Sequence, residues 1–452
     1  MSTRISDKFS AWQAECEARF QQLKANEEEL NRIFIDIYGL QDELTPEVAE
    51  KDVTVHRIFR TKEDVPESMK GSAYVRTLRD EIVSLLSYAV GCMFGRYSLD
   101  VEGLAYAGGD FSAQWVVVSG RYYKREAVEY YVGKELQRAS GMAESDAVDG
   151  GNVSAGEAAA AGRIVRFVRP DAQSGGVGPL QYRRGTSAKL YEGICKLSLD
   201  CTGLDSGAGD TAYDLCSPEI LAAITSGSGA ELVQRGWKDA ERVDWKAVHC
   251  ALTTGRFCPD ADNCIPVTDE EYFPDDVVGR LVEFVRTVYG ADTLEENLDF
   301  IATALGNRGN TSREVIRNYF LNDFIKDHIR TYQKRPIYWM FDSGKMNGFK
   351  ALVYMHRWNA DTTGNVRVEY LHRIQRVYES EISRMQDVAG SSPNAREVSA
   401  AQKRRDKLAK QLKETRAYDA GLAHLALARI VPKHQLAHVP GKLRVELVRD
   451  LF

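Results

Sequence analysis

The sequence predicts a mainly α-helical protein with small β elements, and three features carry this prediction. In residues 5–44 and 366–422, apolar side chains recur every seven residues, which is the spacing of long helices that pack along a seam. Two short apolar runs on either side of Asn347-Gly348 predict a β-hairpin. Residues 109–261 mix strand-like and helix-like segments with Gly-, Ala- and Ser-rich segments, which predicts a mixed module with flexible segments.

Composition sets the broad class of the protein. The chain has 452 residues, of which 44% are hydrophobic and 27% charged, so it can form two or three domains. Its longest apolar run, residues 82–94, is too short to cross a bilayer, and its polar first residues do not resemble a secretory signal. Eight scattered cysteines show no disulfide-framework spacing. We therefore expect a cytoplasmic protein with no membrane partner.

Residues 1–108 are expected to form an N-terminal helical region. A long helix is predicted by the seven-residue spacing of five apolar side chains, which are Phe9, Cys16, Leu23, Leu30 and Ile37. A second helix, residues 79–94, is apolar on nearly all sides, so we expect it to be buried.

Residues 109–261 form the predicted mixed module. Residues 115–118 and 164–168 have the composition of strands, and residues 122–138 that of a helix. Residues 140–162, between them, have the composition of a flexible segment. Near the end of the module stand four side chains that could bind zinc, His249, Cys250, Cys258 and Cys264. Because no Cys-x-x-Cys pair accompanies them, buried free thiols are the better interpretation, and we predict no metal site.

Residues 262–365 are expected to combine helices with the β-hairpin. Helices are predicted over residues 275–289 and 293–305, the second with a Thr293/Glu296 capping box. A further helix should begin at a Thr311/Glu314 capping box and end before Pro336. Residues 337–341 and 349–356 then have strand composition on either side of a turn.

This third region is also the candidate DNA-contact domain. From Arg308 to Arg357 there are ten basic and four acidic residues, a net charge of +6 in a chain whose total is −6. Interspersed aromatic side chains could stack on bases. The alternative is a solvated basic face over an ordinary aromatic core. The predicted DNA-binding residues are Lys326, Arg330, Lys334, Arg335, Lys345, Lys350, Arg357, Tyr332 and Trp339.

Residues 366–422 are predicted to form an antiparallel coiled-coil hairpin. Leu371, Tyr378 and Met385 keep the seven-residue period in the first arm, as Ala401 and Leu408 do in the second. The second arm also carries a run of lysines and arginines, which predicts a basic outer face. Residues 423–452 are expected to form a variable tail.

Four stretches carry a resemblance to a known family. They are NEEELNRIFIDIYGLQDEL, IVSLLSYAVGCMFGRYSLD, IPVTDEEYFPDDVVGRLVEFV and QKRPIYWMFDSGKMNGFKALVYMHRW, the last followed by VEYLHRIQ. In order and content, residues 10–108 and 262–428 resemble the C-terminal region of adenine-specific DNA methyltransferases of the BREX phage-defence type. Residues 109–261 have no place in the family pattern, so the resemblance implies that they are an inserted module. The resemblance implies a role beside DNA in modification of the cell's own DNA and in phage defence, within a restriction-modification-like system. The implied partners are DNA and the catalytic methyltransferase portion or other BREX proteins.

The family's catalytic motifs do not occur in this chain. In the family, an Asn-Pro-Pro-Tyr motif clamps the flipped-out base, and a Gly-rich turn holds S-adenosylmethionine. The chain has 12 prolines and no Pro-Pro pair. Its glycine clusters at residues 175–178 and 207–209 lack a convincing strand–turn–helix context, so flexible loops are the better interpretation. We therefore predict no catalytic and no cofactor-binding residue here, although the complete family enzyme uses S-adenosylmethionine.

Two functional hypotheses follow from the sequence. In the first, the chain is a DNA-binding and assembly portion of a BREX-type methyltransferase, without catalytic activity of its own. In the second, it is a protein-interaction subunit or a non-functional fragment of that system with no direct DNA contact. DNA binding by the isolated chain discriminates between them.

Overall fold

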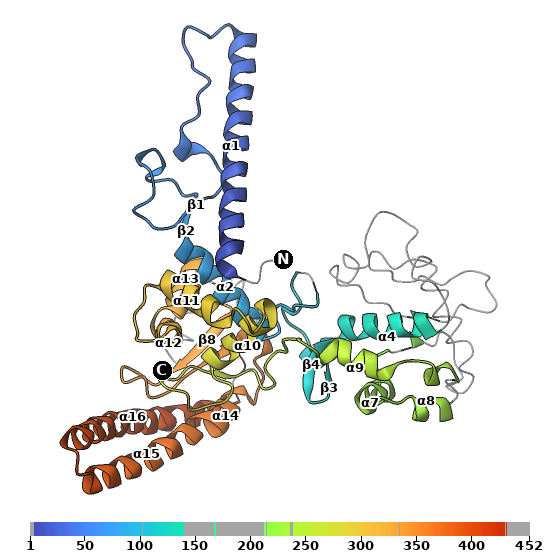
Figure 1. The fold of residues 1–452 in the computed structure, drawn as a ribbon, viewed down its shortest axis with the longest axis vertical. Coiled ribbons are helices and arrows are strands. Elements are labelled where there is room, and N and C mark those ends of the chain that lie inside the picture. The colour runs from blue at the N-terminus through green and yellow to red at the C-terminus, as the bar shows by residue number, and fades with distance from the viewer. Residues whose placement is uncertain are drawn as a thin grey trace.

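The computed structural model describes residues 4–101, 103–139, 167–168, 212–213, 215–235, 238–333, 335–429 and 431. These residues are mainly helical with small sheets, which confirms the predicted fold class. One long helix, α1, projects from the central body, and a helical hairpin of α15 and α16 projects elsewhere (Figure 1). A third group, containing α4 and α7 to α9, lies to one side of the body (Figure 1). None of the described helices is long and apolar enough to cross a membrane.

The N-terminal helix α1 (Ile5–Tyr38) is only partly embedded in the fold. Phe9 and Cys16, from the predicted seam, are buried. Leu30 and Ile37, from the same seam, are exposed. The predicted long helix is therefore confirmed, and its apolar seam is buried near the body but exposed in the far half, which projects away from the body (Figure 1).

After α1 the chain turns back along the helix and enters the core. Gly39 ends α1 with a left-handed φ of 66°. A 3₁₀ turn (Glu50–Asp52) and a second one (Glu67–Met69) accompany two short parallel strands, β1 (Arg57–Phe59) and β2 (Val75–Thr77). The next helix, α2 (Leu78–Met93), begins at a complete capping box, in which Thr77 and Asp80 each accept a hydrogen bond from the other's backbone N–H.

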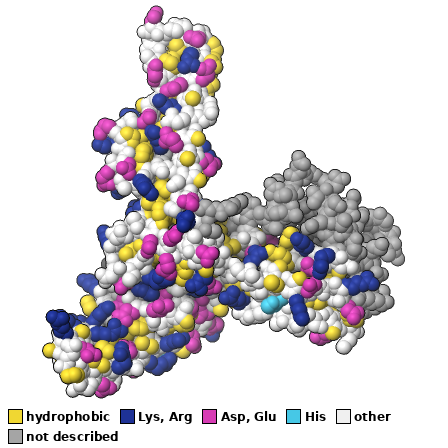
Figure 2. Space-filling view, viewed as in Figure 1, with side chains coloured by type: hydrophobic (Ala, Val, Ile, Leu, Met, Phe, Trp, Pro, Cys, Tyr) yellow, Lys and Arg dark blue, Asp and Glu magenta, His cyan; other side chains and the backbone are white. Residues whose placement is uncertain are grey.

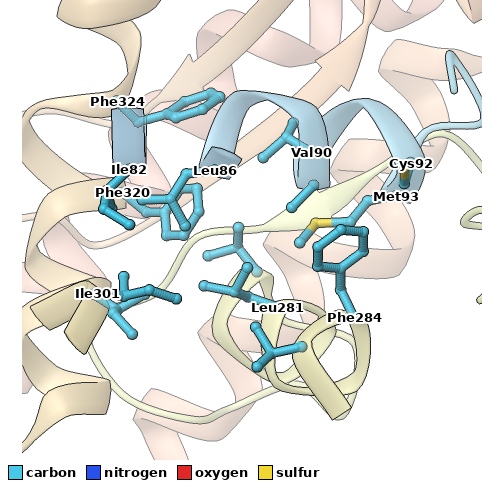
Figure 3. Packing of buried hydrophobic residues seen from close by; sticks show 14 of the residues in the cluster. Ile82, Leu86, Val90, Cys92, Met93, Leu281, Phe284, Ile301, Phe320 and Phe324 are labelled. Carbon is cyan, nitrogen blue, oxygen red and sulfur yellow. The ribbon is translucent and has the colours of Figure 1, made fainter. Parts of the chain in front are cut away.

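Helix α2 lies at the centre of the main hydrophobic core. Ile82, Leu86 and Val90 are buried against side chains from residues 262–365 (Figure 3). The facing helices are α10 (Val277–Tyr289), α11 (Leu294–Leu305), α12 (Ser312–Asn322) and α13 (Phe324–Tyr332). Side chains from the predicted N-terminal region and from the predicted DNA-contact domain therefore share one core.

Residues of the predicted insertion build a second core. They form α3 (Phe111–Gln114), β3 (Trp115–Val118), β4 (Arg121–Lys124) and α4 (Arg125–Ala139). Two-residue strands β5 (Phe167–Val168) and β6 (Ala212–Tyr213) pair with each other. Then follow α7 (Pro218–Ser226), α8 (Ala230–Gln234), a 3₁₀ turn (Lys238–Glu241) and α9 (Trp245–Thr253). Trp245 is buried in this core and donates a hydrogen bond to the Ala240 carbonyl, 2.8 Å away.

Two details of the insertion differ from the sequence-based expectation. The predicted helix over residues 122–138 begins at Arg125, because the residues before it pair as β4 with β3. The predicted strand over residues 164–168 is described only at Phe167–Val168. The glycine clusters at 175–178 and 207–209, and the segment 140–162, lie outside the described residues.

The predicted β-hairpin is confirmed and gains a third strand. Strands β8 (Tyr338–Asp342) and β9 (Lys350–Tyr354) pair antiparallel, with Tyr338 opposite Tyr354. The short strand β7 (Ile265–Pro266) pairs with the other edge of β9, so the order is β7-β9-β8. Because β9 is central, all five of its residues are buried.

The C-terminal helices pack their inner face on this sheet. A 3₁₀ turn (Met355–Arg357), α14 (Thr362–Asn365) and a π-helix (Val366–Leu371) lead into α15 (His372–Ser391), and α16 (Ala395–Leu427) returns beside it. In residues 366–422, the side chains named above for their seven-residue period are all buried, namely Leu371, Tyr378, Met385, Ala401 and Leu408. Several of them share a core with Phe349 and Val353 of the hairpin. The seam is therefore shared between the two helices and the sheet.

Helix α16 also holds the hairpin turn in place. The Glu414 carboxylate accepts hydrogen bonds from the Ser343 hydroxyl at 2.9 Å and from the backbone N–H groups of Met346 and Gly348 at 2.8 and 3.1 Å. One acidic side chain thus accepts hydrogen bonds from three donors of the turn, which would otherwise bond to water.

Candidate nucleic-acid interface

The helical part of the candidate interface consists of two helices rather than the single predicted one. Thr311 caps α12 by accepting a hydrogen bond from the Glu314 N–H, while the Glu314 carboxylate binds the backbone N–H of Asn310. The helix ends at Asp323, where φ is −122°, and α13 begins at the next residue. Asn and Asp are weak helix formers, so the Asn322-Asp323 pair explains the break.

The capping box predicted for α11 is wrong. The helix does begin at Leu294, but the Thr293 hydroxyl donates to the Tyr289 carbonyl, 3.2 Å away. The Glu296 carboxylate is paired with Arg4, across the junction with α1. A contact distant in sequence thus replaces the local one.

Two of the predicted cations face solvent on α13. The side chains of Lys326 and Arg330 are 74% and 65% exposed, and their spacing of four residues places them on one helix face. Each has an acidic neighbour: the Lys326 Nζ lies 3.2 Å from Asp323 and the Arg330 guanidinium 3.2 Å from Asp327. Such exposed pairs are weak and can exchange for phosphate contacts.

The loops on either side of β8 carry two further cations. Arg335 and Lys345 are exposed, and among the described residues neither has an acidic partner within 4.0 Å. Lys334, also predicted to contact DNA, lies outside the described residues. Gln333, which ends α13, adopts a left-handed φ of 50°, so the chain turns sharply before Arg335.

Two predicted cations lie inside the fold. Lys350 is buried in β9, where its ammonium donates to the Leu321 carbonyl and pairs with Asp342, both at 3.0 Å. Arg357 donates to the carbonyl oxygens of Phe94, Asp260 and Ala261, and its guanidinium lies 3.7 Å from the centre of the Phe111 ring. Burial lowers the pKa of Arg357. Both residues hold elements together: Lys350 is buried, and Arg357 is half-buried with its guanidinium bonded to the backbone.

The two predicted aromatic contacts are half-buried. Tyr332 packs against the His328 ring, with ring centres 4.5 Å apart. Trp339 packs against the core shared by the sheet and α15. The structure therefore places both among packed side chains.

His328, buried within this aromatic group, is a structural residue. Its Nε2 accepts from the backbone N–H groups of Ile337 and Tyr338, which connect α13 to the start of β8. Burial, together with the nearby Arg96, lowers its pKa to about 4. A neutral imidazole that accepts two backbone hydrogen bonds fixes the entry into the hairpin.

Acidic side chains from outside the basic segment neutralise part of its charge. On α12, Arg313 forms a two-point pair with Glu295, and Arg317 is paired with the buried Asp276. The net charge of +6 in residues 308–357 therefore overstates the positive surface. Figure 2 shows basic and acidic side chains interspersed over the visible face of the body and the helical hairpin.

A pocket that was not predicted from the sequence adjoins Lys326. It has a volume of about 350 Å³, and its lining combines apolar side chains with the polar ones of Arg308, Asn318, Asn322, Asp323 and Lys326. The Asn318 side chain donates to the Arg308 carbonyl at 2.7 Å, and the Asn322 side chain to the Asn318 carbonyl at 3.0 Å. In the sequence, the four-residue spacing of the two asparagines on a predicted helix indicated that they lie on one face.

The basic face of α16 is partly neutralised. Arg404 forms a two-point pair with Glu270, and Lys407 lies 2.6 Å from Asp269. Lys403, Lys410 and Lys413 are exposed, and no acidic partner lies within 4.0 Å of them among the described residues. These three lysines form a second cationic surface.

The side chains considered for zinc are not assembled into a ligand set. His249 lies 2.9 Å from the Ser119 hydroxyl. Cys258 is buried in the core of the insertion and Cys264 in the core of the C-terminal hairpin, while Cys250 is exposed. In the described part of the chain, no three His, Cys, Asp or Glu side chains are grouped as metal ligands.

Comparison with known proteins shows what this chain is similar to. No family model matches the chain. It is 32% identical over 421 residues to the adenine-specific methyltransferase PglX of Lacticaseibacillus casei (strain Zhang), a match that spans 92% of this chain and 22% of that protein. It is 42% identical over 180 residues to the adenine-specific methyltransferase BrxX of Escherichia coli O9:H4 (strain HS), which is 38% of this chain and 15% of that protein. The matched part of the chain spans only about a fifth or less of the length of these two proteins. The chain is therefore homologous to part of the PglX and BrxX adenine-specific methyltransferases.

Proposed function

We propose that this chain is the DNA-holding and assembly portion of a BREX-type adenine-specific DNA methyltransferase and has no catalytic activity of its own. The observation that carries the proposal is the surface made by Lys326, Arg330 and Arg335, three solvent-facing cations beside the β8–β9 hairpin. It belongs to a chain homologous to adenine-specific methyltransferases. Cations of this kind neutralise phosphates and position a protein on DNA without reading its sequence.

Two of the three cations, Lys326 and Arg330, lie on a helix that is tied to the core, which favours a binding role, whereas Arg335 lies in the loop before β8. Asp327 of α13 pairs with Arg79 of α2 at 3.0 Å, so the helix that carries Lys326 and Arg330 is tied to the central core. His328 ties the same helix to the start of β8. Cations held on fixed elements lose less conformational freedom on binding than cations on a mobile loop.

Binding of duplex DNA by the purified chain tests the first part of the proposal. The variant Lys326→Gln/Arg330→Gln/Arg335→Gln should bind more weakly than the wild type to every DNA sequence tried. A matched control is Lys51→Gln/Lys62→Gln/Lys70→Gln, which removes the same charge from exposed lysines of the N-terminal region. Equal weakening in both variants would mean that net charge, and not this surface, governs binding.

The absence of activity is tested separately. The purified chain should neither transfer methyl groups to plasmid DNA nor bind S-adenosylmethionine in calorimetry, because the sequence has no Pro-Pro pair to form the family's base clamp. Methyl transfer in preparations free of any other methyltransferase would overturn this part.

The second candidate function is a protein-interaction subunit without DNA contact. It is favoured by the pairing of Lys326, Arg330 and Arg313 with nearby acids, which leaves fewer free cations than the sequence suggests. This function predicts weak DNA binding that is the same in the wild type and in the surface variant.

A further inference from the structure

The far half of α1 carries an exposed apolar stripe. Its members recur at intervals of three and four residues, which places them on one face of the helix. They are Leu30, Ile33, Phe34, Ile37 and Tyr38, and their exposed fractions lie between 44% and 70%. In Figure 1 this half of α1 extends away from the body. Contiguous large apolar side chains of this kind mark interaction sites on soluble proteins.

In the first half of α1, the corresponding apolar side chains are buried. Ile5, Phe9 and Cys16 are buried in the main core. Phe20 is buried in a small cluster with Val53 and Met69 from the returning chain. Ile35, on another face of the far half, is buried as well, whereas the described residues leave the stripe itself exposed.

Charge restricts the kind of partner that can cover the stripe. Residues 25–44 contain six acids and one base, a net charge of −5. The single base, Arg32, is already paired with Glu29. Two copies of the chain that met through this end of α1 would place like charges together, which is unfavourable. The phosphates of DNA or of an anionic membrane would be repelled in the same way.

We propose that the stripe at residues 30–38 docks an amphipathic helix of another polypeptide, whose apolar seam is bordered by lysines and arginines. Helix-in-groove and helix-on-helix contacts use this spacing of anchors, and charges beside the seam select the partner. The helix presents the stripe in a fixed conformation, with Gly39 ending it by a backbone N–H bond to the Asp36 carbonyl. This proposal rests on the assembly part of the proposed function, because it names the class of partner in that assembly. It does not depend on DNA binding.

Two designed peptides test the proposal on the full chain. Both have three heptads with leucine at the seam, and they carry either lysine or glutamate beside it. The lysine peptide should bind in fluorescence anisotropy, and its affinity should fall with added salt. The glutamate peptide, or the lysine peptide with the variant Ile33→Gln/Ile37→Gln, should bind at least about tenfold more weakly.

The control variant alters exposed positions of α1 outside the stripe, as Gln22→Ala/Ala25→Gln, and should bind the lysine peptide like the wild type. Circular dichroism should show equal helix content in both variants. DNA binding of Ile33→Gln/Ile37→Gln should be unchanged, so a failure here is distinguishable from a failure of the DNA-binding proposal. Equal binding of both peptides, binding of neither, or a concentration-dependent dimer that the stripe variant abolishes would overturn the proposal.

Discussion

Arg317 of α12 is paired with the carboxylate of Asp276, whose other oxygen caps α10. Asp276 is fully buried and accepts from the Gly279 N–H at 2.7 Å. Arg317 also donates to the Thr268 carbonyl at 2.9 Å, in the segment that follows β7. One ion pair therefore joins α10, α12 and the segment after β7. A buried pair with its remaining hydrogen bonds satisfied is costly to break, because the charge left behind has no partner.

Arg317→Gln should therefore lower the free energy of unfolding by about 3–5 kcal/mol. The matched control is Arg313→Gln, one turn earlier on α12, which loses an exposed pair with Glu295 and should cost at most about 1 kcal/mol. Urea unfolding followed by circular dichroism measures both. Similar losses in the two variants would show that burial of Asp276 does not set the strength of this contact.

The C-terminal seam gives a second prediction. Leu408 of α16 is buried in the core shared with α15 and the sheet, whereas the next residue, Ala409, is exposed. Leu408→Asp buries an unpaired charge and should destabilise the protein by several kcal/mol, seen as a large fall in melting temperature. Ala409→Asp should melt within a few degrees of the wild type. A Leu408→Asp variant that melts like the control would mean that the seam is wrongly placed.

Acid sensitivity follows from His328. Its pKa is lowered from the ordinary 6.5 to about 4 by burial and by Arg96. Between these values the unfolded chain takes up a proton that the folded protein does not, so this residue makes stability fall as the pH drops from about 6.5 towards 4. The loss should approach about 3 kcal/mol.

The variant His328→Gln should show a flatter pH profile of unfolding free energy across that window, because the amide cannot be protonated there. His424→Gln, at an exposed position of α16, serves as the control and should reproduce the wild-type profile. If His328→Gln keeps the full wild-type pH dependence, other groups are responsible for it.

The hairpin could be predicted from residues that are neighbours in the sequence. Which face of a helix is buried depended on the tertiary fold. The turn residues between β8 and β9 sit next to apolar runs, so pairing followed from neighbours in sequence. The seven-residue period of α1 identified Leu30 and Ile37 correctly as apolar seam positions. It carried no information on whether the body reaches them, and they are exposed.

The charge pattern was misleading for a similar reason. Lys350 counted as a surface cation in the linear sequence, but it occupies a central strand and is bound to Leu321 and Asp342. Its apolar neighbours from Ala351 to Tyr354 were a signal that this run is buried. Arg313 and Arg317 found acidic partners on α11 and at the start of α10, which a count over one segment does not include.

The salt dependence of DNA binding gives the most specific prediction about the candidate interface. Each phosphate contact on duplex DNA contributes about 0.9 to the slope of log K against log salt concentration. Replacing Lys326, Arg330 and Arg335 with Gln should therefore flatten the slope by up to about 2–3 units. Lys326 and Arg330 must first leave their acidic neighbours on α13 and at its start to reach phosphates, so their effect should be smaller than that of Arg335.

Single variants resolve this order. Arg335→Gln alone should change the slope by close to about 0.9, and Lys326→Gln by less. Lys350→Gln should leave the slope unchanged while lowering stability, because its ammonium is bonded inside the sheet. A loss of binding confined to one DNA sequence would instead indicate base contacts by the hairpin. Equal slopes for the wild type and the triple variant over the same salt range would remove this surface from the DNA interface.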